Sequence, residues 1–374
     1  MSSPFVKKCR PRKLEDVVGQ AVTVQSLTNA FKANDLHHAY IFAGNLGCGK
    51  TSLARIMAAI ENCLKKKSEP CGECDNCKSI LADKSIDVKE IDAASNRGID
   101  DIREIKKDAE FNPIDCKTKY YIIDEAHSLT GYAAEAALKL IEEPPAHVRF
   151  ILCTTDPHLL KDTILSRCIF FKFNKVNWSD LYSHLCNIAK KEKLNYEEDA
   201  LKIAAKAAHG SVRDALQNLQ SISSYVGRGQ ELTYEKAKEI IGIPDERLYF
   251  VLINAITKID VPGGMQAISE LLKDGKDARE IIDGLQNHLR NLMIVLTCGK
   301  QLDHFEFMED EIKRLQHQKD SLSSKNKKVD MVLKWLNLLY DVNKGIIINL
   351  DLQMLLEKFV VEAILVKRRI EEEE

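Results

Sequence analysis

Over about the first 175 residues, apolar runs of strand length alternate with stretches whose apolar positions recur at helical spacing. The strand-like runs are 39–43, 88–91, 120–123, 150–154 and 169–173, and the helix-like stretches between them include 51–62, 99–111 and 133–143. This alternation predicts a parallel sheet with helices on both faces. Pro144 and Pro145 end the last of these helices, because a residue that precedes proline resists the helical conformation.

The pattern changes at about residue 177, beyond which helical spacing dominates and no strand is expected. Helical stretches cover 180–193, 197–210 and 212–226, and glycine-containing breaks follow at 227–229 and 242–244. The remainder to about residue 367 is again helical, with a turn at 262–264 and a polar loop at 321–328. We therefore expect an α/β domain at 1–176, two helical domains at 177–242 and 243–368, and an acidic tail at 369–374.

The composition is that of an ordinary globular chain, with 45% hydrophobic and 29% charged residues. Because the net charge is only −2, any nucleic-acid binding has to come from a local basic patch. The sequence has no run of 18 apolar residues and no apolar core of a signal peptide near its start, so we expect a cytoplasmic protein without a membrane segment. An odd count of 11 cysteines argues against a disulfide framework.

The loop at 44–52 reads Gly-Asn-Leu-Gly-Cys-Gly-Lys-Thr-Ser and lies between a strand-like run and a helical stretch, the context that gives the phosphate-binding pattern its meaning. There the glycines let backbone N–H groups surround a β-phosphate, and the helix N-terminus adds partial positive charge. Lys50 can reach the β- and γ-phosphates, and the Thr51 hydroxyl can bind Mg²⁺. The alternative is a glycine turn before a core helix. The Lys-Thr pair in register favours binding of a nucleoside triphosphate.

Two carboxylates, Asp124 and Glu125, follow directly after the predicted strand at 120–123. A P-loop ATPase needs one acid near Mg²⁺ and a second acid that orients the attacking water, and these residues suit the two roles in that order. Adjacent acids are also common on protein surfaces. The apolar strand before them and the P-loop upstream favour the catalytic interpretation.

Further polar positions extend the candidate site. Thr154 and Thr155 end the next strand, where either hydroxyl can meet the γ-phosphate or the attacking water, the alternative being a simple turn. Arg167 follows a short helical turn and is a candidate arginine finger for a neighbouring subunit's nucleotide, although most exposed arginines are solvated or ion-paired. Arg213 opens a helix in the second domain, from which it either reaches a γ-phosphate or pairs with the neighbours of Asp214.

Four cysteines, Cys63, Cys71, Cys74 and Cys77, form the pattern C-x7-C-x2-C-x2-C. Four thiolates within 15 residues can close a tetrahedral Zn²⁺ site, and the ion would supply folding energy to a segment without an apolar core of its own. The lack of an evident open position indicates a structural site, with a redox pair as the alternative. The other seven cysteines are expected to be small apolar packing residues.

A P-loop followed by a four-cysteine insert is an unusual combination, and further motifs accompany it. They are Arg10-Pro11, the run Glu-Asp-Val-Val-Gly-Gln at 15–20, Asp124-Glu125-Ala126-His127, Glu142-Glu143-Pro144-Pro145, Thr154-Thr155-Asp156-Pro157, Ser166-Arg167-Cys168 and Gly210-Ser211-Val212-Arg213-Asp214-Ala215-Leu216. In these motifs the chain closely resembles the gamma/tau subunits of bacterial DNA polymerase III, the AAA+ ATPases of the sliding-clamp loader. The resemblance covers about residues 5–225 and is only architectural beyond them.

The resemblance implies a P-loop AAA+ domain at 1–176 with a zinc insert at 63–77, a helical lid at 177–242 and an α-helical collar for oligomerisation at 243–368. Its cofactors would be ATP, Mg²⁺ held by Thr51 and Asp124, and structural Zn²⁺ held by the four cysteines. The catalytic set would be Lys50, the Walker B acids Asp124 and Glu125, Thr155 (less surely Thr154) as sensor 1, Arg167 as the finger and Arg213 as sensor 2. The ATP contacts would be Val17 and Val18 beside the adenine, with Gly44, Asn45, Leu46, Gly47, Cys48, Gly49, Lys50, Thr51, Ser52 and Arg213.

The resemblance also implies a function: an ATP-dependent motor that opens the sliding clamp and loads it onto primed DNA during replication. Its partners would be delta, delta-prime and further gamma copies in a pentameric ring, the sliding clamp and primer-template DNA. Arg97 and Lys139 are the candidates for DNA phosphate contacts. A DNA-directed DNA polymerase (nucleotidyltransferase) label would belong to the holoenzyme, because no separate cluster of metal-binding acids is visible in the sequence.

The sequence departs from the family pattern at Cys48 and Ser52, where other small residues are usual. It also stops near residue 374 without a long proline-rich, basic extension, which predicts a short, gamma-like form and puts helicase and polymerase partners in doubt. One alternative is a non-hydrolysing scaffold subunit like delta-prime, against which the intact P-loop and acid pair argue. Another is a different AAA+ DNA-processing ATPase, which the four-cysteine insert disfavours.

Overall fold

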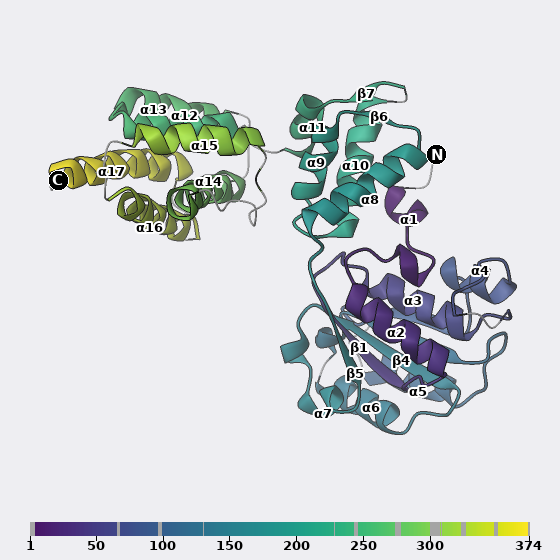
Figure 1. The fold of residues 1–374 in the computed structure, drawn as a ribbon. Helices are drawn as coiled ribbons and strands as arrows, with labels where there is room; N and C mark the ends of the chain where they lie inside the picture. The colour runs from purple at the N-terminus through teal and green to yellow at the C-terminus, as the bar shows by residue number, and fades with distance from the viewer. Residues whose placement is uncertain are drawn as a thin grey trace. The chain divides into compact units, whose positions relative to one another are not determined.

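The structure, a computed structural model, describes residues 4–65, 68–95, 99–129, 131–227, 229–242, 246–273, 278–299, 307, 309–322, 327–347 and 351–372. Its internal contacts divide the chain into two compact units, Met1–Ile241 and Gly242–Glu374, and each is described by itself (Figure 1). Within the described ranges, no helix has the length and apolar character needed to cross a bilayer.

A five-stranded parallel sheet forms the base of the first unit. Its strands are β1 (Ala39–Gly44), β2 (Val88–Asp92), β3 (Lys119–Asp124), β4 (Val148–Thr154) and β5 (Ile169–Phe173), in the spatial order β2-β3-β4-β1-β5. Every neighbouring pair is parallel, which confirms the predicted sheet. Because β4 lies between β3 and β1, the loops that follow these three strands meet at one edge of the sheet.

Helices cover both faces of this sheet, as the sequence pattern predicts (Figure 1). One face carries α2 (Ala21–Ala33), α3 (Lys50–Glu61) and the short α4 (Asp75–Leu81), and the other carries α5 (Ile99–Ala109), α6 (Gly131–Glu142) and α7 (Asp162–Leu165). Side chains of β1 alternate between the two cores. Tyr40 and Phe42 pack with α3, whereas Ile41 and Ala43 pack with the α5 and α6 side.

Four helices follow the sheet within the first unit: α8 (Trp178–Lys191), α9 (Glu198–Lys206), α10 (Val212–Val226) and α11 (Tyr234–Ile241). The expectation of no strand beyond residue 177 is wrong, because β6 (Asn195–Tyr196) and β7 (Glu231–Leu232) pair in parallel. Strands of two residues are too short to leave an alternating pattern in the sequence. α9 also ends before the predicted residue 210, ahead of a turn in which His209 and Gly210 have positive φ.

Residues 4–20, which we call the N-terminal arm, contact both the core beside the sheet and the helices that follow the sheet. The arm contains α1 (Phe5–Lys8) and the 3₁₀ helix η1 (Leu14–Asp16). The Phe5 N–H donates to Gln220 Oε1 at 2.9 Å, and the Lys8 ammonium lies 2.6 Å from a Glu192 carboxylate oxygen. Leu14 is buried in the core that α3 shares with the sheet. The arm therefore connects the sheet to helices α8 and α10.

All elements described in the second unit are helices: α12 (Glu246–Thr257), α13 (Val261–Leu272), α14 (Ala278–Cys298), α15 (Glu309–Ser321), α16 (Lys328–Ile347) and α17 (Leu352–Glu372). Trp335 is fully buried among them, and its indole N–H donates to the Ala363 carbonyl at 3.0 Å. This bond satisfies a polar group that burial would otherwise leave unpaired, so Trp335 fixes α16 against α17.

Two expectations for the second unit are wrong. Residues 262–264 form the first turn of α13 and not a loop, because proline suits the start of a helix and the Asp260 side chain caps it by accepting the Gly263 N–H at 3.0 Å. Residues 369–372 continue α17, so they are not a separate tail. Residues 373–374 and the centre of the predicted polar loop, 323–326, lie outside the described residues.

His288 on α14 makes the stability of the second unit depend on pH. Burial lowers the pKa of this imidazole from 6.5 to about 4, and its Nε2 lies 2.8 Å from Gln318 Oε1. Between these pH values the unfolded chain binds a proton that the folded chain does not, so stability should fall as the pH falls from about 6.5 to about 4. The loss should total roughly 3 kcal/mol.

Urea unfolding at several pH values, followed by Trp335 fluorescence in a chain with Trp178→Phe, measures this effect. His288→Gln keeps a donor for Gln318 but cannot titrate, so its unfolding free energy should change less over the same range. Equal pH dependence in the two chains would show that His288 is not the responsible group.

Candidate nucleotide site

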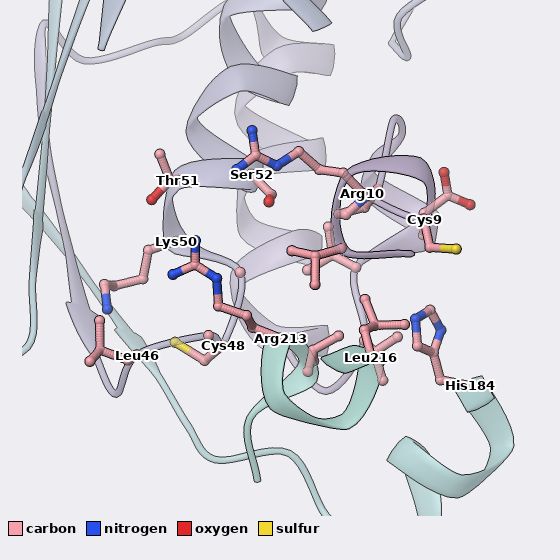
Figure 2. A pocket seen from close by; sticks show the side chains of 18 of the residues that line it. Cys9, Arg10, Leu46, Cys48, Lys50, Thr51, Ser52, His184, Arg213 and Leu216 are labelled. Atoms are coloured by element: carbon pink, nitrogen blue, oxygen red, sulfur yellow. The ribbon is translucent and has the colours of Figure 1, made fainter. Parts of the chain in front are cut away.

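A cavity opens beside the loop that joins β1 to α3 (Figure 2). The loop and the start of α3 contribute Leu46, Gly47, Cys48, Gly49, Lys50, Thr51 and Ser52 to its lining. Gly49 caps α3 with φ +101°, a conformation that residues with side chains rarely adopt. The first turn of the helix, with its unpaired N–H groups, is thereby placed at the cavity wall, which is the arrangement that binds anions.

Lys50 is the buried cation of this loop, with 5% of its surface exposed. Its Nζ donates to the carbonyls of Gly44 at 2.6 Å and Asn45 at 2.9 Å. Gly44 and Asn45 are thus placed behind the lysine and are not among the cavity-lining residues. Among the described residues no carboxylate pairs with Lys50, so its charge is balanced only by carbonyl dipoles. An anion in the cavity would be a stronger partner.

The two predicted acids stand at the end of β3. The Thr51 hydroxyl donates to Asp124 Oδ2 at 3.0 Å, so these two oxygen-bearing side chains meet next to the loop. Glu125 follows with φ +49°, and its backbone N–H donates to Asp124 Oδ1 at 3.0 Å. This sharp turn lets consecutive carboxylates occupy different positions at the same sheet edge. The Thr51–Asp124 pair has the oxygen ligands that Mg²⁺ prefers.

The structure distinguishes the two threonines at the end of β4. The Thr155 hydroxyl lies 3.4 Å from Glu125 Oε2 and donates to Asp156 Oδ2 at 2.8 Å. Thr154 is fully buried, and its Oγ1 lies 3.1 Å from His127 Nδ1. Thr155 is therefore the threonine that reaches the second acid. His127 Nδ1 also lies 3.4 Å from Glu125 Oε2. The sequence analysis assigned no role to His127, although it is the last residue of the motif at 124–127.

Helix α10 contacts the phosphate-binding loop directly. The Gly47 carbonyl accepts the N–H groups of Val212 at 3.0 Å and Arg213 at 3.3 Å. A Cβ added at Gly47 would lie 2.1 Å from Ser211 Oγ, so only glycine permits this approach. Arg213 lines the cavity together with Lys50, which brings together two residues that are 163 positions apart in the sequence.

Val17 and Val18 of the N-terminal arm also line the cavity, as expected. The lining residues that were not predicted for the site include three with polar side chains, Arg10, Glu90 and His184. Arg10 belongs to the quoted Arg10-Pro11 motif, which was a usable signal, whereas Glu90 and His184 carry none in the sequence. Burial, and then the charge of Lys191, lower the pKa of His184, so its imidazole is neutral at pH 7.

Arg167 is not part of this cavity lining. It lies after α7, with Nε 2.7 Å from Glu142 Oε1 and Nη1 donating to the Thr163 carbonyl at 2.8 Å. The pair is 36–40% exposed, which makes it a weak surface interaction. Within this chain Arg167 therefore contacts Glu142 and Thr163 and does not reach the cavity.

The four predicted cysteines converge. Their Sγ atoms all lie within 4.8 Å of one another, and Cys71 Sγ is 3.9 Å from Cys77 Sγ. A tetrahedral ion with metal–sulfur bonds of about 2.3 Å needs sulfur separations of roughly 3.8 Å, so the cluster suits such an ion. Helix α4, which begins within the insert, has core support beyond it, because Ile80 packs in the core that α3 shares with the sheet.

Backbone groups in the insert favour thiolate. The N–H of Cys74 points to Cys71 Sγ at 3.4 Å and, with that of Glu73, lowers the pKa of the Cys71 thiol to about 6. Burial raises the pKa of the Cys77 thiol instead. A metal ion would offset that cost, because it binds the deprotonated sulfur. Of the other seven cysteines, Cys48 and Cys153 are buried as expected, and the other five are partly exposed.

The proposed DNA contacts are placed only in part. Lys139 is an exposed residue in the last turn of α6. Arg97 lies outside the described residues.

Comparison with known proteins assigns the family. Three DNA polymerase III families match successive parts of the chain: the delta subunit family at 19–177, the clamp-loader ATPase lid domain at 180–222, and domain III of subunits gamma and tau at 232–340. The gamma subunit of Buchnera aphidicola subsp. Schizaphis graminum is 33% identical over 83% of this chain and 86% of its own length. The chain belongs to the DNA polymerase III gamma/tau family. The predicted family and the AAA+ fold with a helical lid are thereby confirmed.

The gamma/tau relatives differ in length. The tau subunit of Bacillus subtilis is 40% identical over 77% of this chain but only 51% of its own length, so the chain spans about half of that relative. Among solved structures, the Thermotoga maritima RuvB Holliday junction branch migration motor aligns with TM-score 0.49 and 18% identity over 67% of this chain and 80% of that chain. That similarity is too low to bear on family or function.

Substitution of Gly47 tests the contact between the loop and α10. In Gly47→Ala the new Cβ would lie 2.1 Å from Ser211 Oγ, at a residue with φ +72°. We expect the first turn of α10 to shift, at a cost of about 1–3 kcal/mol. Hydrogen exchange should then be faster at the amides of Val212 and Arg213.

Gly227→Ala is the matched control, because Gly227 has φ +81° but no atom within 4 Å of its added Cβ. It carries the backbone strain without the clash. If hydrogen exchange at Val212 and Arg213 is the same in Gly47→Ala as in Gly227→Ala, the close approach of Gly47 to Ser211 does not position the start of α10.

Proposed function

We propose that this chain is an ATP-hydrolysing motor subunit of a clamp loader, which opens a sliding clamp and loads it onto primed DNA. The observation that carries the proposal is that Lys50, the Thr51–Asp124 pair and Arg213 line one cavity in a gamma/tau family member. The proposal includes ATP as the nucleotide and hydrolysis as the reaction, with Val17 and Val18 beside the base.

The residues fit a magnesium nucleotide. Thr51 and Asp124 would hold Mg²⁺, which would supply positive charge next to the phosphates. Lys50 would exchange its carbonyl partners for phosphate oxygens, and Arg213 would approach the γ-phosphate from α10. Because α10 rests on Gly47, loss of the γ-phosphate would change the contacts that position this helix.

Glu125 would orient the attacking water, since Asp124 is already engaged with Thr51. Thr155, 3.4 Å from the Glu125 carboxylate, would hold that carboxylate or the γ-phosphate. Arg167 would leave Glu142 and act on a neighbouring subunit's nucleotide. A finger that acts in trans makes hydrolysis depend on assembly.

The partners in this proposal are delta, delta-prime and further gamma copies in a pentameric ring, the clamp, and primer-template DNA. Residues 177–242 would be the lid and 243–368 the oligomerising collar. Lys139 would contact DNA phosphates; Arg97, outside the described residues, stays a prediction from the sequence. The alternative is a non-hydrolysing scaffold subunit, which would not need Lys50, Thr51 and Asp124 in register.

The deciding experiment measures ATP hydrolysis by the purified chain, alone and with delta-type and delta-prime-type subunits, clamp and primed DNA. Hydrolysis should rise only with all of them. Arg167→Ala should lower the stimulated rate by several orders of magnitude while leaving ATP binding intact, because the finger stabilises charge only in the transition state. Lys50→Ala should abolish binding itself.

Lys161→Ala is the matched control, since Lys161 also pairs with an α6 acid, Glu135, at 3.1 Å and has similar exposure. It should hydrolyse ATP like the wild type. ATP binding without stimulated turnover would contradict the motor proposal and leave the scaffold alternative.

We also propose that the cysteine cluster holds one structural Zn²⁺ ion. Cys71→Ser should remove the metal, measured by elemental analysis of the purified chain, and lower the thermal unfolding temperature of the first unit, because the ion supplies folding energy. Cys298→Ser, which lies in α14 far from the cluster in sequence, should change neither. Full metal content in Cys71→Ser would contradict the assignment.

A further inference from the structure

His127 lies within hydrogen-bonding distance of two groups at the carboxyl ends of β3 and β4. It belongs to the 3₁₀ helix η2 (Ala126–Ser128), which follows the sharp turn at Glu125 and begins with the buried Ala126. Its Nδ1 is 3.1 Å from Thr154 Oγ1 and 3.4 Å from Glu125 Oε2. One ring nitrogen therefore faces both the second acid of the candidate site and the last residue of β4.

The neighbouring groups determine which form of the imidazole fits. The Asp156 backbone N–H already donates to Thr154 Oγ1 at 3.1 Å, and the Glu125 carboxylate, when ionised, can only accept. An Nδ1 without hydrogen would face the Glu125 oxygen with a lone pair, which is repulsive. A hydrogen at Nδ1 instead lies between two acceptor oxygens, so the arrangement selects a ring that donates from Nδ1.

His127 is also the donor that the Glu125 carboxylate needs. The Thr155 hydroxyl has a single hydrogen, and its closer acceptor is Asp156 Oδ2 at 2.8 Å, whereas Glu125 Oε2 lies 3.4 Å away. Among the described residues, His127 is the other side chain with a donor that reaches this carboxylate. The Glu125 side chain has several rotatable bonds, so the Nδ1–H of His127 is what fixes its direction.

The direction of this carboxylate matters for the proposed reaction. A carboxylate that orients the attacking water has to hold it in line with the γ-phosphate, and a displacement of about 1 Å can cost on the order of 100-fold in rate. Because Nδ1 of His127 contacts Thr154 as well as Glu125, it connects the carboxylate to the strand end that carries Thr155. The acid and the hydroxyl of the candidate site are thereby held by the same piece of backbone.

We propose that His127 is a positioning residue for ATP hydrolysis: its Nδ1–H holds the Glu125 carboxylate at the end of β4, where that carboxylate orients the attacking water. This inference rests on the proposed ATPase function. His127 is not among the residues that line the nucleotide cavity, and it acts only through Glu125. It should therefore affect the rate of hydrolysis and not the affinity for ATP.

Two substitutions distinguish the position of the donor. Asparagine places its amide nitrogen near the position of Nδ1, whereas the longer glutamine carries it towards the position of Nε2. In the complex with delta-type and delta-prime-type subunits, clamp and primed DNA, His127→Gln should lower kcat roughly 10- to 100-fold and leave ATP affinity unchanged. His127→Asn should retain most of the wild-type kcat. His158→Gln, the same change at an exposed histidine in the loop after β4, is the matched control and should hydrolyse ATP like the wild type.

A chain with two substitutions shows whether His127 acts through Glu125. In Glu125→Gln the carboxylate is already absent, so adding His127→Gln should lower the single-turnover rate of hydrolysis no further. A purely structural role of His127 would lower the rate in both backgrounds, and that result would overturn the inference.

Three further results would also overturn it: equal losses of kcat in His127→Asn and His127→Gln, an unchanged or higher kcat in His127→Gln, or a loss of ATP affinity that accounts for its lower activity. Failure of the proposed function would be seen separately, as a wild-type complex that binds ATP without stimulated turnover, and it would remove this inference as well.

Discussion

The spatial order of the parallel strands is the constraint on which the candidate site depends. With β4 between β3 and β1, the phosphate-binding loop, Asp124 and Thr155 all follow strands whose carboxyl ends adjoin. Parallel strands require long connections, so Asp124 and Thr155 are more than 70 positions from Lys50 and still lie at the same edge of the sheet. A different strand order would leave each motif intact in sequence and disperse the site.

The cations in and around the cavity differ in their partners. Arg55 is paired with two acids and belongs to the frame of the fold. Lys50 has only carbonyl partners, and Arg10 and Arg213 face the same cavity. Three acids also line the cavity, but no ion pair joins them to Lys50 or Arg10 in the described residues, so a bound anion would be a stronger partner for these cations. Arg167 is different again, since it lies outside the cavity in a solvent-exposed pair with Glu142.

The second level of organisation is the contact between the loop and α10. Two backbone N–H groups at the start of α10 donate to the Gly47 carbonyl. Because glycine has no side chain, Ser211 can approach Gly47 closely. The N-terminal arm adds a second connection through Phe5 and Lys8. The phosphate-binding loop and the helices after the sheet are therefore mechanically joined, which is what a nucleotide-dependent switch requires.

The sequence by itself determined the five strands, the helices on both sheet faces, the P-loop, the acid pair and the four-cysteine cluster, because each depends on local periodicity or on spacing within a few residues. It missed β6 and β7, which are too short to show a pattern, and it placed a loop at 262–264 where Asp260 caps a helix. Only the tertiary structure decided that Thr155 and not Thr154 reaches Glu125, and that Arg10, Glu90 and His184 share the cavity. Such choices depend on which distant backbone lies alongside, and residue spacing along the chain does not encode that.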